Sequence, residues 1–239
     1  MNMTITTNKK MFEVIAFDAD DTLWHNESIF TMTQIKFNEM LSSHGQEVVD
    51  QTLYSTQIKN LQHFGYGIKG FILSMIETAI ELTDCEVRGH EIKQILDFGS
   101  EMLAAPIELL PHVREVVEEL SRNYSLMLIT KGDLIDQETK IARSGLSEFF
   151  DAVEIVSDKT TEVYSKILNR HKINTSRFMM IGNSMRSDIV PIVQIGAQAV
   201  HVPYLSTWEH EQDHPPVDPE HYTELKHLGL LPQLIKGKG

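Results

Sequence analysis

The sequence is poor in cysteine, in long apolar runs and in positive charge. Cys85 is the single cysteine among 239 residues, so an intrachain disulfide or a zinc site built from several cysteines is excluded. The N-terminal stretch MNMTITTNKK lacks the apolar segment of a signal peptide, and no run approaches the length of a membrane span. We therefore expect a cytoplasmic protein, in a compartment that keeps thiols reduced.

Positive charge is scarce, with 21 lysine and arginine residues against 34 acidic residues and a formal net charge of −13. Nucleic acids and anionic membranes are themselves negative, so this balance argues against either one as a partner. If the substrate is also an anion, some local positive group must offset the field of the acidic chain.

The apolar pattern of most of the chain is typical of an α/β protein. Residues 12–17 form the continuous apolar run of a parallel strand that is covered on both faces. Further strands are expected at 126–129, 152–156, 178–181 and 199–202, and helices at 113–120, 134–143, 161–170 and 187–195. Strands that alternate with helices predict a doubly wound parallel sheet with helices on both faces.

Residues 27 to about 105 follow a different pattern, which interrupts this alternation after the first strand. Apolar residues recur at helical spacing in four stretches, 29–41, 53–64, 71–82 and 92–103. The prolines of APIELLPHV then lead back to the alternating pattern. We interpret residues 24–105 as an inserted helical domain, and residues 1–23 with 106–239 as the α/β core.

Polar side chains suited to phosphate chemistry follow four of the predicted strands. Ligands bind beyond the carboxyl ends of the strands in an open parallel sheet, so we expect these side chains to meet. They are Asp18, Asp20, Thr130, Lys131, Lys159, Asn183 and Asp188. Magnesium takes carboxylate and amide oxygens, an aspartate can act as a nucleophile, and a lysine can offset phosphoryl charge. The set predicts phosphoryl transfer with Mg²⁺ as the cofactor.

Four segments at these strand ends resemble the motifs of the haloacid dehalogenase superfamily. DADDTLW resembles the first motif, LMLITKGD the second, SDKTTEVYSKIL the third and MIGNSMRSD the fourth, in the family's order. The resemblance spans residues 12 to about 204. It implies a Rossmann-like core with a helical cap between the first two motifs. It also implies a magnesium-dependent phosphatase that hydrolyses a small phosphorylated metabolite, a phosphomonoester, under that cap.

The resemblance also implies a role for each motif residue. Asp18 would be the nucleophile that forms an aspartyl-phosphate, and Asp20 would be the general acid and then the general base. Thr130 and Lys159 would bind the phosphoryl group. Lys131 is a further candidate for phosphate binding, and the alternative is that it is an ordinary surface lysine. Because the haloalkanoate dehalogenases of this fold lack an acid where Asp20 stands, its presence favours phosphate ester hydrolysis.

For the metal, the resemblance implies four ligands: Asp18, the backbone carbonyl of Asp20, Asn183 and Asp188. Asn183 departs from the family, which commonly has an acid there. An amide oxygen can bind magnesium but brings no negative charge, so we expect a lower metal affinity and a larger part for Asp188. Asp21, next to these residues, is expected to cap or hydrate the turn, and Trp24 to pack at the hinge into the helices.

Two other functions remain open within the same fold. A phosphomutase shares the chemistry but returns the phosphoryl group to the substrate. A module that binds phosphorylated ligands without hydrolysing them would also fit Asn183, although the other motif residues are intact. The oligomeric state is left open by the sequence.

Two further motifs are rejected on their context. GYGIKG, at 65–70, matches the dinucleotide-binding pattern but follows an expected helix, so we predict a turn whose Tyr66 or Lys69 contacts substrate. HEQDH, at 210–214, matches the zinc-peptidase pattern. Pro215 and Pro216 follow it and disfavour the continuing helix that the peptidase mechanism requires. We expect a surface loop there.

Overall fold

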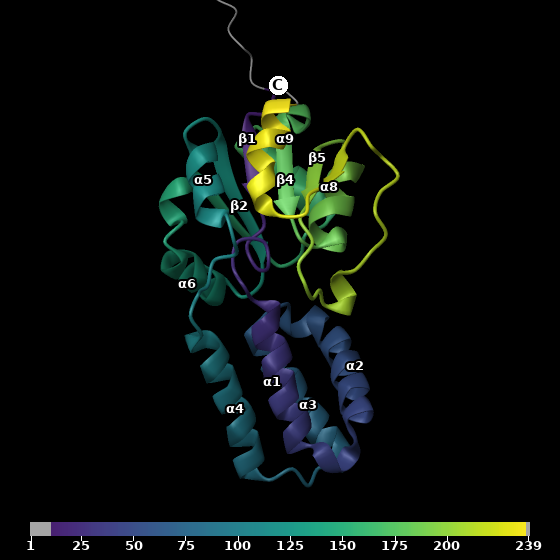
Figure 1. Cartoon of the computed structure of the whole chain (residues 1–239). Coiled ribbons are helices and arrows are strands. Elements are labelled where there is room, and N and C mark those ends of the chain that lie inside the picture. Colours follow the sequence, from purple (N-terminus) through teal and green to yellow (C-terminus); the bar gives the residue numbers. More distant parts are fainter. Residues whose placement is uncertain (1–10, 238–239) are drawn as a thin grey trace, which may run out of the picture.

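Six strands form one sheet in residues 11–237, the part of the chain that this computed structural model describes (Figure 1). They are β1 (Val14–Phe17), β2 (Ser125–Lys131), β3 (Ala152–Val156), β4 (Phe178–Gly182), β5 (Gln198–His201) and β6 (Tyr222–Glu224). Their order is β3-β2-β1-β4-β5-β6, and all neighbours are parallel. Residues 1–10, where we expect no signal peptide, and 238–239 lie outside the described part.

Strand β1 lies in the middle of the sheet, and its side chains pack alternately into two apolar clusters. Ile15 and Phe17 belong to one cluster, and Val14 and Ala16 belong to the other. Side chains of a strand alternate between the two faces of the sheet, so a strand covered on both faces must be apolar at every position. The continuous apolar run of β1 has this cause.

Helices cover both faces of the sheet. The cluster that contains Ile15 is filled by α5 (Val113–Ser121), α6 (Leu134–Ser144) and α9 (Leu231–Gly237). The cluster on the other face is filled by α7 (Thr161–His171), α8 (Val190–Gln194) and a π-helical turn at Met185–Ile189. The doubly wound α/β sheet predicted from the sequence is thereby confirmed.

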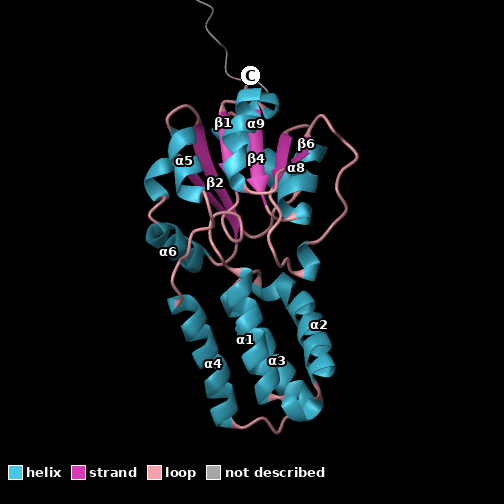
Figure 2. Ribbon diagram, in the orientation of Figure 1, coloured by secondary structure: helices cyan, strands magenta, loops and turns pink. Residues whose placement is uncertain are grey.

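The four helices predicted between the first two strands are also confirmed. They are α1 (Glu27–Met40), α2 (Gln46–Phe64), α3 (Ile68–Leu82) and α4 (Gly89–Ala104). They share an apolar core of their own, with Phe37, Leu53, Met75 and Ile95 fully buried. Figure 2 shows these helices beyond the carboxyl ends of the strands. The predicted domain boundaries remain a prediction.

Several short elements were not predicted. Strand β6 and helix α9 follow the segment that we expected to be a loop. Short 3₁₀ helices lie at Ser42–His44, Ser147–Phe149, Thr175–Arg177, Glu209–Glu211 and Leu228–Leu230. Each is too short to produce a recognisable apolar period. Within residues 11–237, no helix has the length and apolar character that crossing a membrane requires.

Candidate active site

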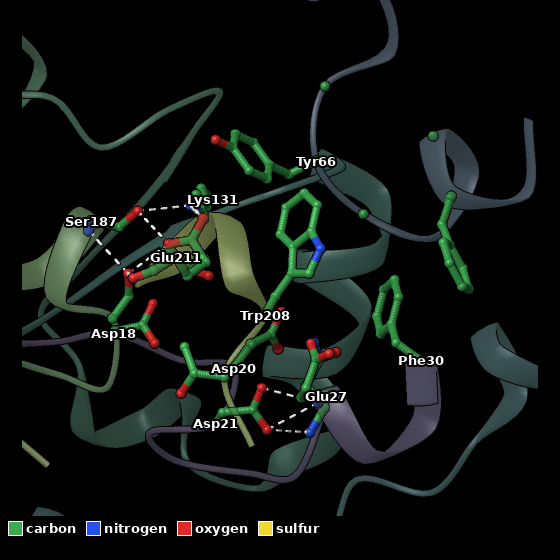
Figure 3. Close-up of a pocket in the computed structure, with 18 of the residues that line it drawn as sticks. Asp18, Asp20, Asp21, Glu27, Phe30, Tyr66, Lys131, Ser187, Trp208 and Glu211 are labelled. Carbon is green, nitrogen blue, oxygen red and sulfur yellow. Dashed lines mark hydrogen bonds and ion pairs between the residues drawn. The ribbon is translucent and has the colours of Figure 1, made fainter. Parts of the chain in front are cut away.

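A cavity with a volume of about 180 Å³ lies where the strand ends meet the inserted helices (Figure 3). All seven side chains predicted from the strand ends line it: Asp18, Asp20, Thr130, Lys131, Lys159, Asn183 and Asp188. The parallel register explains this convergence. Phe17 is paired with Ile181, and the backbone N–H of Asp18 donates to the Ile181 carbonyl at 2.8 Å. The carboxyl ends of β1 and β4 therefore lie side by side at the cavity floor.

Lys159 lies between two buried carboxylates at the floor of the cavity. Its Nζ is 2.5 Å from Asp18 Oδ1 and 2.7 Å from Asp188 Oδ1. Asp188 is held from its other side by the backbone N–H of Ser184, 3.1 Å from Oδ2. A Cβ on Gly182 would lie 2.3 Å from the Asp188 side chain, so the chain needs glycine there for Asp188 to reach Lys159.

Burial shapes the protonation of this group. Burial and the charge of Asp188 raise the pKa of Asp18 to about 7, although Lys159 opposes them. Burial alone would lower the pKa of Lys159, but the two carboxylates outweigh it and raise that pKa. One ammonium thus faces two carboxylates, and a second cation beside Asp18 would stabilise its ionised form.

The donor atoms around Asp18 fit a magnesium ion. The hydroxyl of Thr22 lies 2.9 Å from Asp18 Oδ2 and 3.2 Å from Asn183 Oδ1. A hydroxyl has one hydrogen, so it cannot satisfy both oxygens at once. A hard cation accepts such oxygens as ligands. Within residues 11–237, no group of three His, Cys, Asp or Glu side chains is arranged to hold a metal. The Asn183 amide is among the oxygen donors that line this part of the cavity.

Asp20 is held by three side chains, two of which the sequence interpretation missed. Its Oδ1 accepts from Trp24 Nε1 at 2.7 Å, and its Oδ2 accepts from Gln137 Nε2 at 2.8 Å. Lys140 Nζ lies 2.8 Å from both oxygens. Gln137 and Lys140 stand three residues apart on α6, so both can face the cavity. In the sequence, the only sign of this role is the three-residue spacing of Gln137 and Lys140 in a helix that we described as polar.

Asp21 was expected to cap or hydrate the turn, and its carboxylate accepts hydrogen bonds at the start of helix α1. Its carboxylate accepts from the backbone N–H groups of Asn26 at 2.8 Å and Glu27 at 3.0 Å. Burial raises the pKa of Asp21 to about 7, although these two hydrogen bonds oppose the shift. Trp24 is also where we expected it, fully buried at the start of the inserted helices.

The expectation of a surface loop at 210–214 is wrong for Glu211, which is buried and lines the cavity. Its carboxylate forms an ion pair with Lys131 and accepts from Ser184 Oγ at 2.5 Å and Ser187 Oγ at 2.6 Å. Burial would raise the pKa of Glu211, but Lys131 and the two hydroxyls lower it to about 2. Glu211 ends a 3₁₀ helix that does not reach His214, so the zinc-peptidase helix does not form.

Lys131 lines the cavity, so the alternative interpretation of Lys131 as an exposed surface lysine is wrong. Its side chain is 14% exposed and lies 2.7 Å from Ser187 Oγ. Its ammonium also lies over the Tyr66 ring, 3.9 Å from the centroid. Lys131 thus joins the core to the inserted helices at the cavity wall.

The first three residues of GYGIKG, at 65–67, form the predicted turn between α2 and α3, and the last three begin α3. Tyr66 lines the cavity, and its hydroxyl lies 3.1 Å from His210 Nε2. Lys69 instead pairs with Asp133 of the core at 2.9 Å. Of the two residues proposed to contact substrate, only Tyr66 therefore lies at the cavity.

Comparisons with known proteins point to one family. A family model for haloacid dehalogenase-like hydrolases matches residues 12–196. The crystal structure of a haloacid dehalogenase-like family hydrolase from Xanthomonas campestris is 36% identical, with a TM-score of 0.86 over 96% of this chain and 93% of that one. Glyceraldehyde 3-phosphate phosphatase from Pyrococcus abyssi is 24% identical over 81% of this chain and 82% of its own length. The protein of that name from Methanothermobacter thermautotrophicus is 23% identical over 85% and 91%.

Proposed function

The chain belongs to the haloacid dehalogenase-like hydrolase family and is a hydrolase. From this premise we propose that it is a magnesium-dependent phosphatase that cleaves a small phosphomonoester through an aspartyl-phosphate on Asp18. One observation carries the proposal: buried Lys159 contacts both Asp18 and Asp188 in a cavity at the carboxyl end of β1. Two relatives named as glyceraldehyde 3-phosphate phosphatases support a small phosphate ester as the substrate class.

In the first half of the proposed reaction, an Asp18 carboxylate oxygen attacks phosphorus. The bond from phosphorus to the ester oxygen breaks, and Asp20, as the acid, protonates the departing oxygen. Lys159 and the hydroxyl of Thr130 bind the phosphoryl oxygens at the cavity floor. Lys140, Gln137 and Trp24 fix the position of the Asp20 carboxyl.

In the second half, Asp20 accepts a proton from a water molecule, which attacks the phosphorus of the aspartyl-phosphate. The bond between phosphorus and the Asp18 oxygen breaks, and the Asp18 carboxylate leaves with its electron pair. The carbon–oxygen bond of Asp18 stays intact, and inorganic phosphate is released. A single pair of carboxyl groups thus serves both halves, because Asp20 regains from water the proton that it gave to the departing oxygen.

Asp18, Asp188, Asn183 and the backbone carbonyl of Asp20 would hold the magnesium ion. When bound, magnesium offsets negative charge on the phosphoryl oxygens. The Thr22 hydroxyl that lies between Asp18 and Asn183 supports this assignment, because it cannot satisfy both oxygens.

We assign the role of a cap to the inserted helices, with residues 24–105 as its bounds. Helices α1, α2 and α3 contribute Phe30, Asn60 and Phe71 to the cavity wall. A wall of this kind excludes water, which strengthens the electrostatic interactions at the floor. It also limits the substrate to a small molecule.

The test is phosphate release from a panel of phosphorylated metabolites, including glyceraldehyde 3-phosphate, with magnesium and with EDTA. We expect turnover that magnesium supports and EDTA abolishes. Turnover that requires an added bisphosphate would instead identify a phosphomutase. If no ester is hydrolysed but phosphorylated ligands bind, the chain is a binding module and the proposal is wrong.

A further inference from the structure

One carboxyl group in the cavity has neither a role in the proposed reaction nor a partner within the described part of the chain. Glu27, at the start of α1, lines the cavity, and its side chain points into the same space as Phe30 and Trp208 (Figure 3). Its backbone N–H donates to Asp21. Neither oxygen of its carboxyl has a hydrogen-bond or ion-pair partner among residues 11–237. Glu27 is half-buried, so its carboxyl is open to a partner that enters the cavity.

The other charged groups of the cavity wall are already occupied, which sets Glu27 apart. Each lysine of the wall has carboxylate partners: Lys131 pairs with Glu211, Lys140 with Asp20 and Asp136, and Lys159 with Asp18 and Asp188. The remaining carboxylate, Asp21, accepts backbone hydrogen bonds. No cation of the described wall is therefore left for Glu27.

Aromatic rings form the wall around the Glu27 carboxyl. Phe30 lies one helical turn after Glu27 and packs against Phe71 with ring centroids 5.0 Å apart. Trp208 reaches the same space from the core. The Tyr66 ring is already covered by the Lys131 ammonium. A carboxylate beside aromatic faces is a combination that attracts an organic cation.

We propose that the substrate's leaving group carries an ammonium group, which Glu27 binds beside the rings of Phe30 and Trp208. The inference rests on the proposed function, since it concerns the part of the ester that remains after phosphoryl transfer. Its phosphate would lie at Lys159 and its ammonium at the opposite, cap-side wall. The substrate class is then a phosphorylated amino alcohol or amino sugar.

Without a cation beside it, the Glu27 carboxyl is held largely in its neutral form at pH 7. Burial raises the pKa of Glu27 to about 8, and the charges of Asp21 and Glu211 add to the effect. An ammonium would stabilise the ionised carboxylate, which a neutral hydroxyl does far less well. Glu27 also stands in the first turn of α1, where an acid favours the helix. That role affects stability but does not distinguish one substrate from another.

The test uses matched pairs of esters that differ in one group. The pairs are 2-aminoethyl with 2-hydroxyethyl phosphate and 3-aminopropyl with 3-hydroxypropyl phosphate, assayed with magnesium at pH 7. We expect the wild-type protein to favour the amine of each pair about tenfold in kcat/KM, the effect of one charged hydrogen bond. In Glu27→Gln the amine-to-hydroxyl ratio should fall to about one.

The matched control is Glu39→Gln, an exposed residue on the same helix and outside the cavity wall. It should keep the wild-type ratio. Equal kcat/KM values for both members of each pair in the wild-type protein would overturn the inference while leaving the phosphatase function intact. If no ester is hydrolysed, the phosphatase function fails. Calorimetric affinities of wild-type protein for the two C2 esters then decide, with equal affinities overturning the ammonium site.

Discussion

Lysines at the active-site cavity are buried in pairs with acids, whereas the lysine–acid pairs of the inserted helices lie on the surface. The Lys159 side chain is 1% exposed between Asp18 and Asp188. In the pair of Lys59 with Glu77, which joins α2 to α3, the lysine side chain is 65% exposed. Both regions use the same two chemical groups, but solvent surrounds only one of them.

The difference in burial separates two uses of charge. A buried charge loses its hydration, so removing its partner costs several kcal/mol, and the pair is held in one geometry. An exposed pair is hydrated and screened, and contributes about 0–1 kcal/mol. We infer that the fixed charges at the cavity floor serve the proposed reaction, while the inserted helices owe their stability to their apolar core. The predictions below test this contrast, from the largest expected effect to the smallest.

Asp18→Asn should have the largest effect, because it removes the proposed nucleophile and a partner of Lys159. We expect phosphate release to fall at least about a thousandfold, since no acyl-phosphate can form on an amide. The control is Asp97→Asn, an exposed residue of α4, which should keep wild-type rates. Turnover that survives in Asp18→Asn would show that Asp18 is not the nucleophile.

Glu211→Gln tests a buried pair through stability. The pKa of Glu211 is about 2 in the folded protein against 4.5 for an unperturbed glutamate, so its ionised form stabilises the fold by about 3 kcal/mol at pH 7. This contribution is fully present above pH 4.5 and is lost as the pH falls towards 2. Urea unfolding of wild type and variant should therefore differ by about 3 kcal/mol at pH 7 and converge on acidification.

The matched control for this measurement is Glu209→Gln, an exposed residue two positions earlier in the same 3₁₀ helix. It should change the free energy of unfolding by less than about 0.5 kcal/mol. A similar small loss in Glu211→Gln would mean that the pair with Lys131 contributes no more than a surface pair.

Lys140→Met tests how far the position of Asp20 depends on a buried partner. The variant keeps the bonds from Trp24 and Gln137 but loses two charged contacts of 2.8 Å. We expect kcat to fall about thirtyfold with KM nearly constant, which corresponds to about 2 kcal/mol for the two lost charged contacts. Lys166→Met, on the exposed face of α7, should leave kcat unchanged. An unchanged kcat in Lys140→Met would remove Lys140 from the positioning of Asp20.

The sequence alone predicted the sheet, the inserted helices and the meeting of seven side chains at one edge. It could do so because apolar runs identify parallel strands, and because parallel strands bring their carboxyl ends together whatever connects them. These are properties of the pattern and need no knowledge of packing.

The partners of those side chains could not be predicted in the same way. Lys140 lies on a helix that is polar along most of its length, and only tertiary packing shows that its lysine is buried. Glu211 lies in a segment without a period, between histidines and prolines. Strand β6 has three residues and no apolar alternation. In each case the structure of the residue or strand depends on which distant segment packs against it. That contact exists only in the assembled fold.

Asn183→Asp should sharpen the contrast at the metal site. Adding a negative charge beside Asp18 should lower the magnesium concentration for half-maximal activity about fivefold, which corresponds to roughly 1 kcal/mol. Asn169→Asp, an exposed site on α7, adds the same charge far from the cavity floor and should leave the magnesium requirement unchanged. A magnesium requirement in Asn183→Asp that stays as in the wild type, like that of the control, would place Asn183 outside the metal's ligands.

Lys36→Met should have the smallest effect, because it breaks a pair that solvent already screens. Lys36 lies 2.7 Å from Glu101, and the two side chains are about half exposed. We expect the free energy of unfolding to change by less than about 0.5 kcal/mol, and to depend on salt no more than in the wild type. The variant also removes the Lys36 ammonium from its place 5.7 Å from the centroid of the Phe98 ring, a contact that is weak at an exposed site. A loss as large as that expected for Glu211→Gln would mean that charge pairing, and not apolar packing, stabilises the inserted helices.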